Sequence, residues 1–354
     1  MSRLFEPLKM RGITLRNRIV VSPMCQYSSE DGFASDWHLV HLGSRAIGGA
    51  GVVFTEATAV EARGRISPQD LGIWKDDHIP MLKRITDFVK SQGAVPAMQL
   101  AHAGRKASTA QPWAGGAPIG PDAGGWTPIV SASALPFAPG YQTPEPLTVD
   151  GIGKIAEAFA RAAERALAAG FELIEIHGAH GYLLNQFLSP LSNRRTDAYG
   201  GSFDHRIQAA LDVTRAIRKK WPERLPLWIR ISATDWMEGG WDIDQSVELA
   251  RKLKPEGVDV IDCSSGGTSP DAKIPIGPGY QVLFAERIRR DAQILTGAVG
   301  MITSAEQAET IVSTGQADVV LMAREFLRDP YWPLRSAKAL HAKPQTPVQY
   351  GRAF

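Results

Sequence analysis

Two histidines and a tyrosine lie close together in the stretch 176–202, which reads IHGAHGYLLNQFLSPLSNRRTDAYGGS. His177 and His180 are three residues apart, Tyr182 follows two residues later, and all three come just after a short apolar run, 171–176. Each side chain carries a polar group that needs a hydrogen-bond partner when it is buried, so burying any of the three in an apolar core would cost free energy. The spacing therefore indicates either a functional site at the end of a strand or a structural role in which all three polar groups must find partners.

Three roles fit the two histidines. They could donate hydrogen bonds to a substrate oxygen, be satisfied structural residues, or bind a metal ion. A zinc site would need a third ligand, and Asp197 is available although nothing in its surroundings marks it. The residue types favour donors to a substrate oxygen. Tyr182 could pack against them, or its hydroxyl could act as a general acid.

Arg230 lies inside the apolar run LWIRIS, where an arginine needs an anion because it is almost never fully buried unpaired. The partner could be a structural carboxylate such as Glu56, or a bound ligand. Cys25 could be a small buried hydrophobic residue, the commonest fate of a free cysteine. The other polar or small candidates near ends of predicted strands are Tyr27, Ala57, Gln99 and His102.

Eight short β-branched runs alternate with longer helical patterns, which is typical of repeated βα units around a parallel sheet. The runs are 19–24, 51–59, 95–100, 171–176, 227–232, 258–263, 294–298 and 318–322. Eight repeats, with no G-x-G-x-x-G after the first run, favour a closed (β/α)₈ TIM barrel over an open doubly wound sheet. One connecting helix is expected at 150–169, where apolar residues recur at helical spacing before Gly170.

The segment 103–147 breaks this rhythm, with 7 glycines and 8 prolines among its 45 residues and no helical period. We expect a long connection after the third strand that caps the barrel mouth, within a single barrel domain covering 1–354.

The composition gives no support for nucleic acid or an anionic membrane as the main partner, because 39 Lys+Arg against 37 Asp+Glu leave a formal charge of only +2. The two cysteines are too few for a disulfide framework or for an iron–sulfur cluster, which needs about four thiolates. The amino-terminal residues lack an apolar signal region, and no apolar run reaches the ~18 residues of a membrane span. We therefore expect a soluble, cytoplasmic protein.

Two loops near the C-terminus could bind a phosphate group. They follow the seventh and eighth runs, where barrels of this kind recurrently bind phosphate with a short helix. Gly300 permits a close backbone approach and Arg324 adds positive charge. Together the loops indicate a phosphorylated cofactor, although glycine turns after strands are common.

These motifs resemble the Old Yellow Enzyme family of flavoproteins, in the bacterial subclass typified by YqjM and xenobiotic reductase A. The similar segments cover nearly the whole chain and include LRNRIVVSPMCQYSS, EATAV, QLAHAGRKAS, the stretch 176–206, IRISATD, GAVGMIT, AREFLRDP and PVQYGRAF. The resemblance implies an FMN-dependent ene-reductase. It would take hydride from NADPH or NADH onto tightly bound, non-covalent FMN and pass it to the β carbon of an α,β-unsaturated carbonyl or nitro compound. Reduction of xenobiotics or nitro esters would fit the same chemistry.

The resemblance also implies roles for individual residues. Nine residues fall where the family contacts FMN: Ser22, Pro23, Met24, Cys25, Ala57, Gln99, Arg230, Ala323 and Arg324. Gly300 of the proposed phosphate loop is a further candidate. His177 and His180 match the pair that grips the substrate oxygen, and Tyr182 matches the residue that protonates the α carbon. Tyr27 matches a second substrate-binding tyrosine, and Cys25 a thiol that tunes the flavin potential without acting as a nucleophile.

The C-terminal tail, 342–354, contains Arg352 at the position where an arginine of this family can reach a neighbouring active site. The resemblance therefore implies a homodimer or homotetramer. Two features depart from the family pattern. Ala323 stands where glycine is common, and its methyl would crowd a phosphate only if the backbone needs positive φ. The segment 103–147 is longer than in the shortest relatives and leaves the substrate range open.

Three rival functions differ in class. A dienoyl-CoA reductase would share the barrel, but its cluster and extra nucleotide domain fit neither the length nor the cysteine count. A metal-dependent hydrolase would use His177 and His180 as ligands. A flavin-binding protein without turnover would keep the cofactor and lack the reaction.

Overall fold

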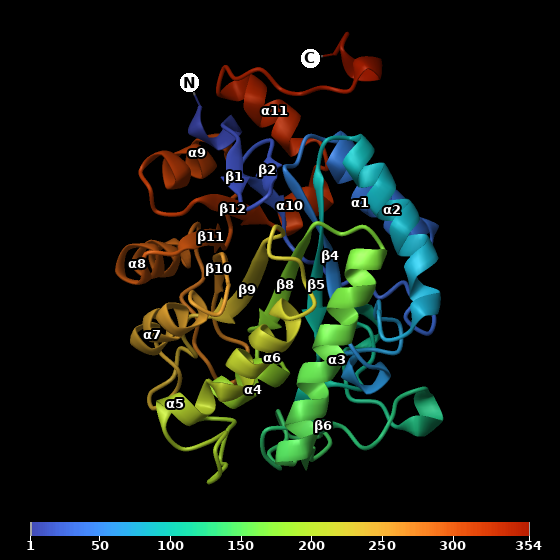
Figure 1. Ribbon diagram of the computed structural model, residues 1–354, viewed down its shortest axis with the longest axis vertical. Coiled ribbons are helices and arrows are strands. Elements are labelled where there is room, and N and C mark those ends of the chain that lie inside the picture. The colour runs from blue at the N-terminus through green and yellow to red at the C-terminus, as the bar shows by residue number, and fades with distance from the viewer. Residues whose placement is uncertain (1, 354) are drawn as a thin grey trace.

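The computed structural model describes residues 2–353 and shows eight parallel strands closed into a barrel, in the order β10-β11-β12-β3-β4-β5-β8-β9 (Figure 1). The strands are β3 (Ile19–Val21), β4 (Val52–Ala59), β5 (Val95–Ala101), β8 (Leu173–Gly178), β9 (Leu227–Ser232), β10 (Val260–Ser264), β11 (Leu295–Val299) and β12 (Val319–Met322). Each run of the sequence that was expected to be a strand contributes one of them. The expected (β/α)₈ barrel is confirmed.

Helices connect consecutive strands and pack on the outside of the barrel (Figure 1). The longer ones are α1 (Asp36–Ile47), α2 (Ile79–Ser91), α3 (Val149–Ala168), α6 (Gln208–Arg218), α7 (Ile243–Leu253), α8 (Val282–Ala292), α9 (Ala305–Ser313) and α11 (Trp332–Ala339). The short ones are α4 (Leu183–Leu188), α5 (Phe203–Arg206) and α10 (Arg324–Arg328). The expected helix at 150–169 is α3, which Thr148 caps by accepting a hydrogen bond from the Gly151 amide. Gly170, at φ +85°, follows its end. None of the helices within residues 2–353 combines the length and apolar character needed to cross a bilayer.

Two strand boundaries differ from the sequence prediction in ways that matter for the site. The first barrel strand ends at Val21 and not at Met24, and Pro23, which has no N–H for a ladder bond, lies in the loop that follows. The fourth strand continues to Gly178, so His177 lies inside β8, in register with Arg230 of β9, and not after the strand. The apolar pattern missed this end because the last inward position of a barrel strand can carry a polar site residue.

The interior of the barrel is filled at one end by an apolar cluster. Alternate residues of the strands supply it, among them Val20, Phe54, Leu173, Trp228, Val260 and Leu321. A hairpin of β1 (Leu8–Met10) and β2 (Ile13–Leu15) adds Met10 and Leu15. The Trp228 ring packs 5.6 Å from that of Phe54, and its Nε1 donates to the Met10 sulfur at 3.1 Å. Because this plug occupies the amino-terminal end, inward polar residues are confined to the carboxyl end.

The segment 103–147 follows β5 and contains η4 (Gly104–Lys106), η5 (Pro112–Ala114), η6 (Pro121–Ala123), β6 (Val130–Ser131) and β7 (Glu145–Pro146). In Figure 1 it lies at the lower end of the molecule, whereas the C-terminus lies at the upper end. Trp113 of this segment makes an edge-to-face contact with Tyr27, at 5.6 Å between ring centroids. The segment therefore borders the loop that follows the first barrel strand.

Candidate active site

His177, His180 and Tyr182 form one cluster at the end of β8. The His177 ring lies 5.1 Å from the His180 ring and 5.1 Å from the Tyr182 ring, centroid to centroid. A tight turn brings the rings together, because His180 and Gly181 both adopt left-handed conformations, at φ +59° and +71°. A Cβ atom on Gly181 would lie 2.1 Å from the Gly267 carbonyl oxygen, so only glycine fits at that position.

Contacts from three other segments hold His180 in place. Its amide donates to Ser232 Oγ at 2.9 Å, and its Nε2 lies 2.7 Å from Ser264 Oγ. Lys106 Nζ donates to the His180 carbonyl oxygen at 2.9 Å. Sequence reasoning missed Ser264 and Lys106, since both approach His180 from distant parts of the chain. In contrast, the buried Nδ1 of His177 has no hydrogen-bond partner within residues 2–353, which leaves it available to a ligand.

Both histidines are neutral near neutral pH. Burial, and then the positive charge of Arg230, lower the pKa of His177 and of His180 well below the ordinary value. Burial, followed by the proximity of Cys25 and Tyr27, raises the pKa of Tyr182 well above its ordinary value. The cluster therefore offers uncharged imidazoles, each with one N–H donor, and a phenol that keeps its proton.

Lys106 adds a positive charge to the cluster, and its ammonium group loses its proton at a lower pH than an ordinary lysine does. Its Nζ lies 4.9 Å from the centroid of the Tyr182 ring and 4.4 Å from that of Phe137. Burial, and then the neighbouring Arg105, lower the pKa of Lys106 to about 8.

Cys25 and Tyr27 lie in the loop after β3. Cys25 is partly exposed, so it is not the small buried hydrophobic residue that the sequence also allowed. Burial within the loop, and then the carboxyl groups of Asp70 and Glu56, raise the pKa of the Cys25 thiol well above its ordinary value. A protonated thiol is a poor nucleophile, since the thiolate is the reactive form.

The suggested ion pair between Arg230 and Glu56 is wrong. Arg230 Nε instead lies 3.0 Å from Asp262 Oδ2 of the neighbouring strand β10. Glu56 faces the other way because the pairing of β4 with β5 shifts between Phe54 and Ala57. Its carboxylate contacts His38 at 3.2 Å and accepts a hydrogen bond from the Gln26 amide at 2.9 Å.

Two other polar candidates have structural partners. Asp197, the possible third metal ligand, accepts hydrogen bonds from Arg195 Nε at 3.0 Å and from the Tyr199 amide at 3.1 Å. Nowhere in residues 2–353 do three His, Cys, Asp or Glu side chains form a group that could hold a metal ion. His102 Nε2 lies 2.9 Å from a carboxylate oxygen of Glu61. Neither residue joins the histidine cluster.

The loops after β11 and β12 meet at one cavity of about 270 Å³, which Gly300, Ala323 and Arg324 line together with Tyr280 and Ser264. Gly300 has φ +128°, and a Cβ atom there would lie 2.9 Å from Gln281 Nε2. Ala323 has φ −106°, outside the left-handed region, so its backbone does not require glycine. Gly300 and Arg324, which the sequence assigned to a phosphate group, therefore line the same cavity.

The remaining residues assigned to FMN lie on barrel strands or in the loop after the first barrel strand. Ser22, Pro23, Met24 and Cys25 follow β3, while Ala57, Gln99 and Arg230 lie on β4, β5 and β9. Ser22 Oγ is buried without a partner within residues 2–353, like His177 Nδ1. Orphaned buried polar atoms beside a pocket that contains an arginine suit a long, polar, phosphorylated ligand such as FMN.

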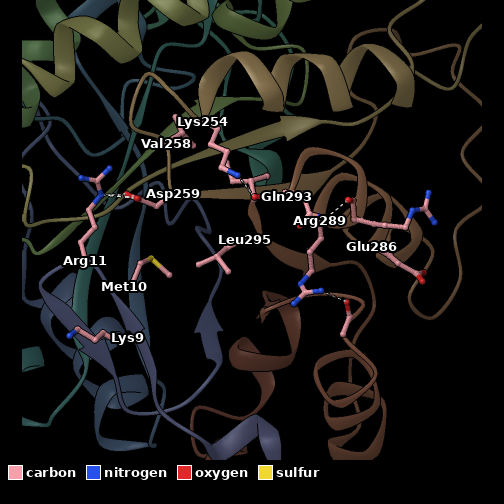
Figure 2. Close-up of a pocket in the computed structure, with 13 residues that line it drawn as sticks. Lys9, Met10, Arg11, Lys254, Val258, Asp259, Glu286, Arg289, Gln293 and Leu295 are labelled. Atoms are coloured by element: carbon pink, nitrogen blue, oxygen red, sulfur yellow. Dashed lines mark hydrogen bonds and ion pairs between the residues drawn. The ribbon is translucent and has the colours of Figure 1, made fainter.

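A second cavity, of about 720 Å³, lies at the amino-terminal end of the barrel beside the β1–β2 hairpin (Figure 2). Its most prominent charges are already paired, with Arg11 Nε 2.7 Å from Asp259 and Arg289 Nε 3.0 Å from Asp318. None of the residues that the sequence assigned to the site lines this cavity. Its larger volume therefore does not make it the active site.

The barrel, the cavity between the loops after β11 and β12, and the neutral histidine cluster suit a flavin-dependent oxidoreductase, and similarity to known proteins identifies the chain as one. Residues 3–343 match the NADH:flavin oxidoreductase / NADH oxidase family. The chain is 49% identical over 354 residues to an NADPH dehydrogenase of Bacillus licheniformis, with 99% of each chain covered. The chain therefore belongs to the NADH:flavin oxidoreductase / NADH oxidase family.

Solved structures extend the comparison. A morphinone reductase in complex with tetrahydroNAD has a TM-score of 0.79 at 27% identity, over 97% of this chain and 92% of that one. A 2-naphthoyl-CoA reductase complex has a TM-score of 0.86 at 25% identity over 96% of this chain, which spans only 52% of that protein's length. The resemblance to the Old Yellow Enzyme family is confirmed, and the protein is an FMN-dependent oxidoreductase that uses a nicotinamide nucleotide.

The raised pKa of Cys25 predicts slow alkylation. Near neutral pH, iodoacetamide should label Cys25 at least about tenfold more slowly than a free cysteine, because little of the thiol is ionised. Peptide mass spectrometry over time measures the rate, and the fully buried Cys263 is an internal reference. A Cys25→Ala variant confirms the assignment. Labelling as fast as that of a free cysteine would contradict a protonated thiol.

Proposed function

We propose that this oxidoreductase is an ene-reductase, which reduces the carbon–carbon double bond of α,β-unsaturated carbonyl or nitro compounds. The FMN, when bound, supplies the hydride, which it accepts from NADPH or NADH and gives to the β carbon. The observation that carries the proposal is the cluster of two neutral imidazoles and one protonated phenol at the end of β8. This set matches what the reduction needs besides hydride: donors for an oxygen and one proton.

His177 and His180 bind the carbonyl or nitro oxygen of the substrate. Two N–H donors aimed at that oxygen withdraw electron density from the β carbon and stabilise the negative charge that develops as hydride arrives, typically by ~3–4 kcal/mol per donor. Ser232 and Ser264 hold His180 from two strands, so the donor direction is fixed before the substrate binds. Neutral rings suit this role, because each can donate one N–H to the substrate oxygen without transferring the proton to it.

Tyr182 protonates the α carbon. Its hydroxyl keeps its proton because burial raises its pKa, and its ring is positioned by edge-to-face packing on His177. Tyr27, whose ring packs against Trp113, is a second substrate-binding residue. Lys106 places a positive charge over the Tyr182 ring.

The flavin contacts are proposed from the same arrangement. The ring system contacts Ser22, Pro23, Met24, Cys25, Ala57, Gln99 and Arg230, while Gly300, Ala323 and Arg324 bind the phosphate. Arg230 supplies positive charge for the electron-rich pyrimidine edge of the ring, and the Gln99 amide can both donate to and accept from it. The protonated thiol of Cys25 lies beside the flavin and tunes its potential.

Replacing both His177 and His180 by alanine should abolish phenol binding, since the phenol oxygen would lose both donors. The measurement is the long-wavelength charge-transfer band that appears when a phenol stacks on bound flavin. A His78→Ala variant is the matched control, because His78 is a buried histidine that contacts the Asp31 carbonyl oxygen away from the cluster. An unchanged band in the double variant would contradict the oxygen-binding role.

Tyr182→Phe should slow alkene reduction by about 10²-fold or more, the lower range for loss of a general acid, while flavin reduction by NADPH stays within about twofold of wild type. Stopped-flow absorbance separates the two half-reactions. Tyr199→Phe, which removes a hydroxyl bound to Asp212 outside the site, is the control. Equal slowing of both half-reactions in Tyr182→Phe would rule out a role as proton donor.

We also infer that Arg352 completes the site of a neighbouring copy in a homodimer or homotetramer. Arg352 is exposed, and the tail that carries it ends at the side of the molecule away from segment 103–147 (Figure 1). A contribution to a site therefore requires a second subunit.

Mixing two inactive variants tests this placement. If Arg352 acts across the interface, Arg352→Ala and Tyr182→Phe subunits should form hybrids in which one site carries both defects and the other carries neither. Activity of the mixture should then exceed that of either variant alone, while each variant mixed with itself is the control. No gain in hybrids whose exchange is shown by native mass spectrometry would contradict the proposal, as would a monomer at working concentration.

A further inference from the structure

A buried cluster of four polar side chains lies between the apolar plug and the proposed flavin site. It consists of Gln99 on β5, Glu175 on β8, Arg230 on β9 and Asp262 on β10. Their exposed fractions are 2%, 0%, 5% and 0%, respectively. The cluster contains two carboxyl groups and one guanidinium group. Glu175 and Asp262 have no part in the proposed reaction.

The contacts inside the cluster are unequal. Gln99 Nε2 donates to Glu175 Oε1 at 2.7 Å, and Arg230 Nε lies 3.0 Å from Asp262 Oδ2. The carboxyl groups of Glu175 and Asp262 are buried on β8 and β10, the two strands that flank β9, and each shifts the pKa of the other. Glu175 Oε2, both carboxyl oxygens of Asp262 and Arg230 Nε have no hydrogen-bond partner within residues 2–353, so the contact between Arg230 and Asp262 is an ion pair without hydrogen-bond geometry. Two facing carboxylate oxygens without a proton between them would repel each other.

Charge balance assigns one proton to this pair. With both acids ionised, the cluster would carry a net negative charge in a dry interior, which costs several kcal/mol. One shared proton makes the cluster neutral. Because Arg230 contacts Asp262, Asp262 carries the charge and Glu175 the proton. Burial, and then the charge of Asp262, raise the pKa of Glu175 well above its ordinary value.

Within residues 2–353, the only charged group besides the two acids that shifts the pKa of Glu175 or Asp262 is Arg230. On β8 the neighbouring titratable group is His177, which is neutral, and on β10 it is Cys263, whose pKa burial raises well above its ordinary value. On β11, Gly297 lies against the Asp262 backbone. Lys106 lies farther off, over the Tyr182 ring.

We propose that Glu175 and Asp262 share one proton beneath the FMN site and act as positioning residues, with Glu175 protonated and donating to Asp262. The pair fixes how Gln99 and Arg230 face the flavin. This inference rests on the proposed contacts of Gln99 and Arg230 with the cofactor.

The position of the proton dictates both orientations. A proton on Glu175 Oε2 leaves Oε1 as an acceptor only, so Gln99 must turn its NH₂ group toward Glu175 and its carbonyl oxygen toward the cofactor. Asp262 engages Arg230 at Nε, which leaves both terminal guanidinium nitrogens as donors for the cofactor. The pyrimidine edge of the flavin therefore meets an acceptor and a donor pair that are set before it binds.

Two isosteric substitutions test the assignment through binding of FMN. Glu175→Gln reproduces a protonated glutamate, with NH₂ toward Asp262 and a carbonyl toward Gln99, and should leave the FMN dissociation constant within about twofold of wild type. Asp262→Asn removes the anion beside Arg230 and should weaken FMN binding by about tenfold or more, the usual scale for losing a buried charged hydrogen-bond partner. Quenching of flavin fluorescence during titration of apoprotein measures both constants. The reverse ranking, or equal losses, would overturn the assignment.

Infrared spectroscopy observes the proton itself and needs no turnover. The difference spectrum between wild type and Glu175→Gln near neutral pH should contain one protonated carboxyl C=O stretch that shifts in D₂O. Asp70, a second buried carboxyl group whose pKa burial raises, is present in both proteins and cancels in this difference. Absence of the Glu175 band from the difference spectrum would overturn the proposal. This readout remains decisive if Asp262→Asn does not fold, and it does not depend on the roles of His177 and Tyr182. A failed proton assignment can therefore be told apart from a failed ene-reductase proposal.

Discussion

The arrangement of the site depends on one constraint, the positive charge of Arg230 inside a closed barrel. Trp228 and its apolar neighbours fill the amino-terminal end, so the guanidinium group can find an anion only at the carboxyl end. Asp262 supplies that charge from the adjacent strand. At the proposed cofactor site, an electron-rich flavin edge would accept hydrogen bonds from the guanidinium group.

The positive charge of Arg230 also affects the protonation of the neighbouring histidines. Arg230 contributes to the lowered pKa of His177 and His180, which keeps both imidazoles neutral. If these residues have the proposed roles, Arg230 links binding of the cofactor electrostatically to polarisation of the substrate. Tyr182, in contrast, has to keep its proton to act as an acid. Burial keeps the phenol protonated, because it raises the pKa of Tyr182. One buried environment therefore sets the protonation of the donors and of the acid.

The sequence predicted the barrel because its eight strands are covered on both faces and read as apolar runs. It also located His177, His180, Tyr182 and the two phosphate loops, since polar residues near strand ends contrast with those runs. It could not identify Asp262 as the partner of Arg230, or Ser264 as the contact of His180. Those contacts depend on the register of neighbouring strands, which joins residues far apart in the chain. The β1–β2 hairpin was missed because its strands are short.

The central claim is that the bound flavin passes hydride from a nicotinamide nucleotide to an activated alkene. The most direct test is the visible absorption of the purified protein under anaerobic conditions, during addition of NADPH and then of cyclohexenone. We expect the spectrum of oxidised flavin, bleaching by NADPH, and full return of the colour with the enone. A flavin that NADPH bleaches but cyclohexenone does not reoxidise would contradict the claim and indicate a different electron acceptor.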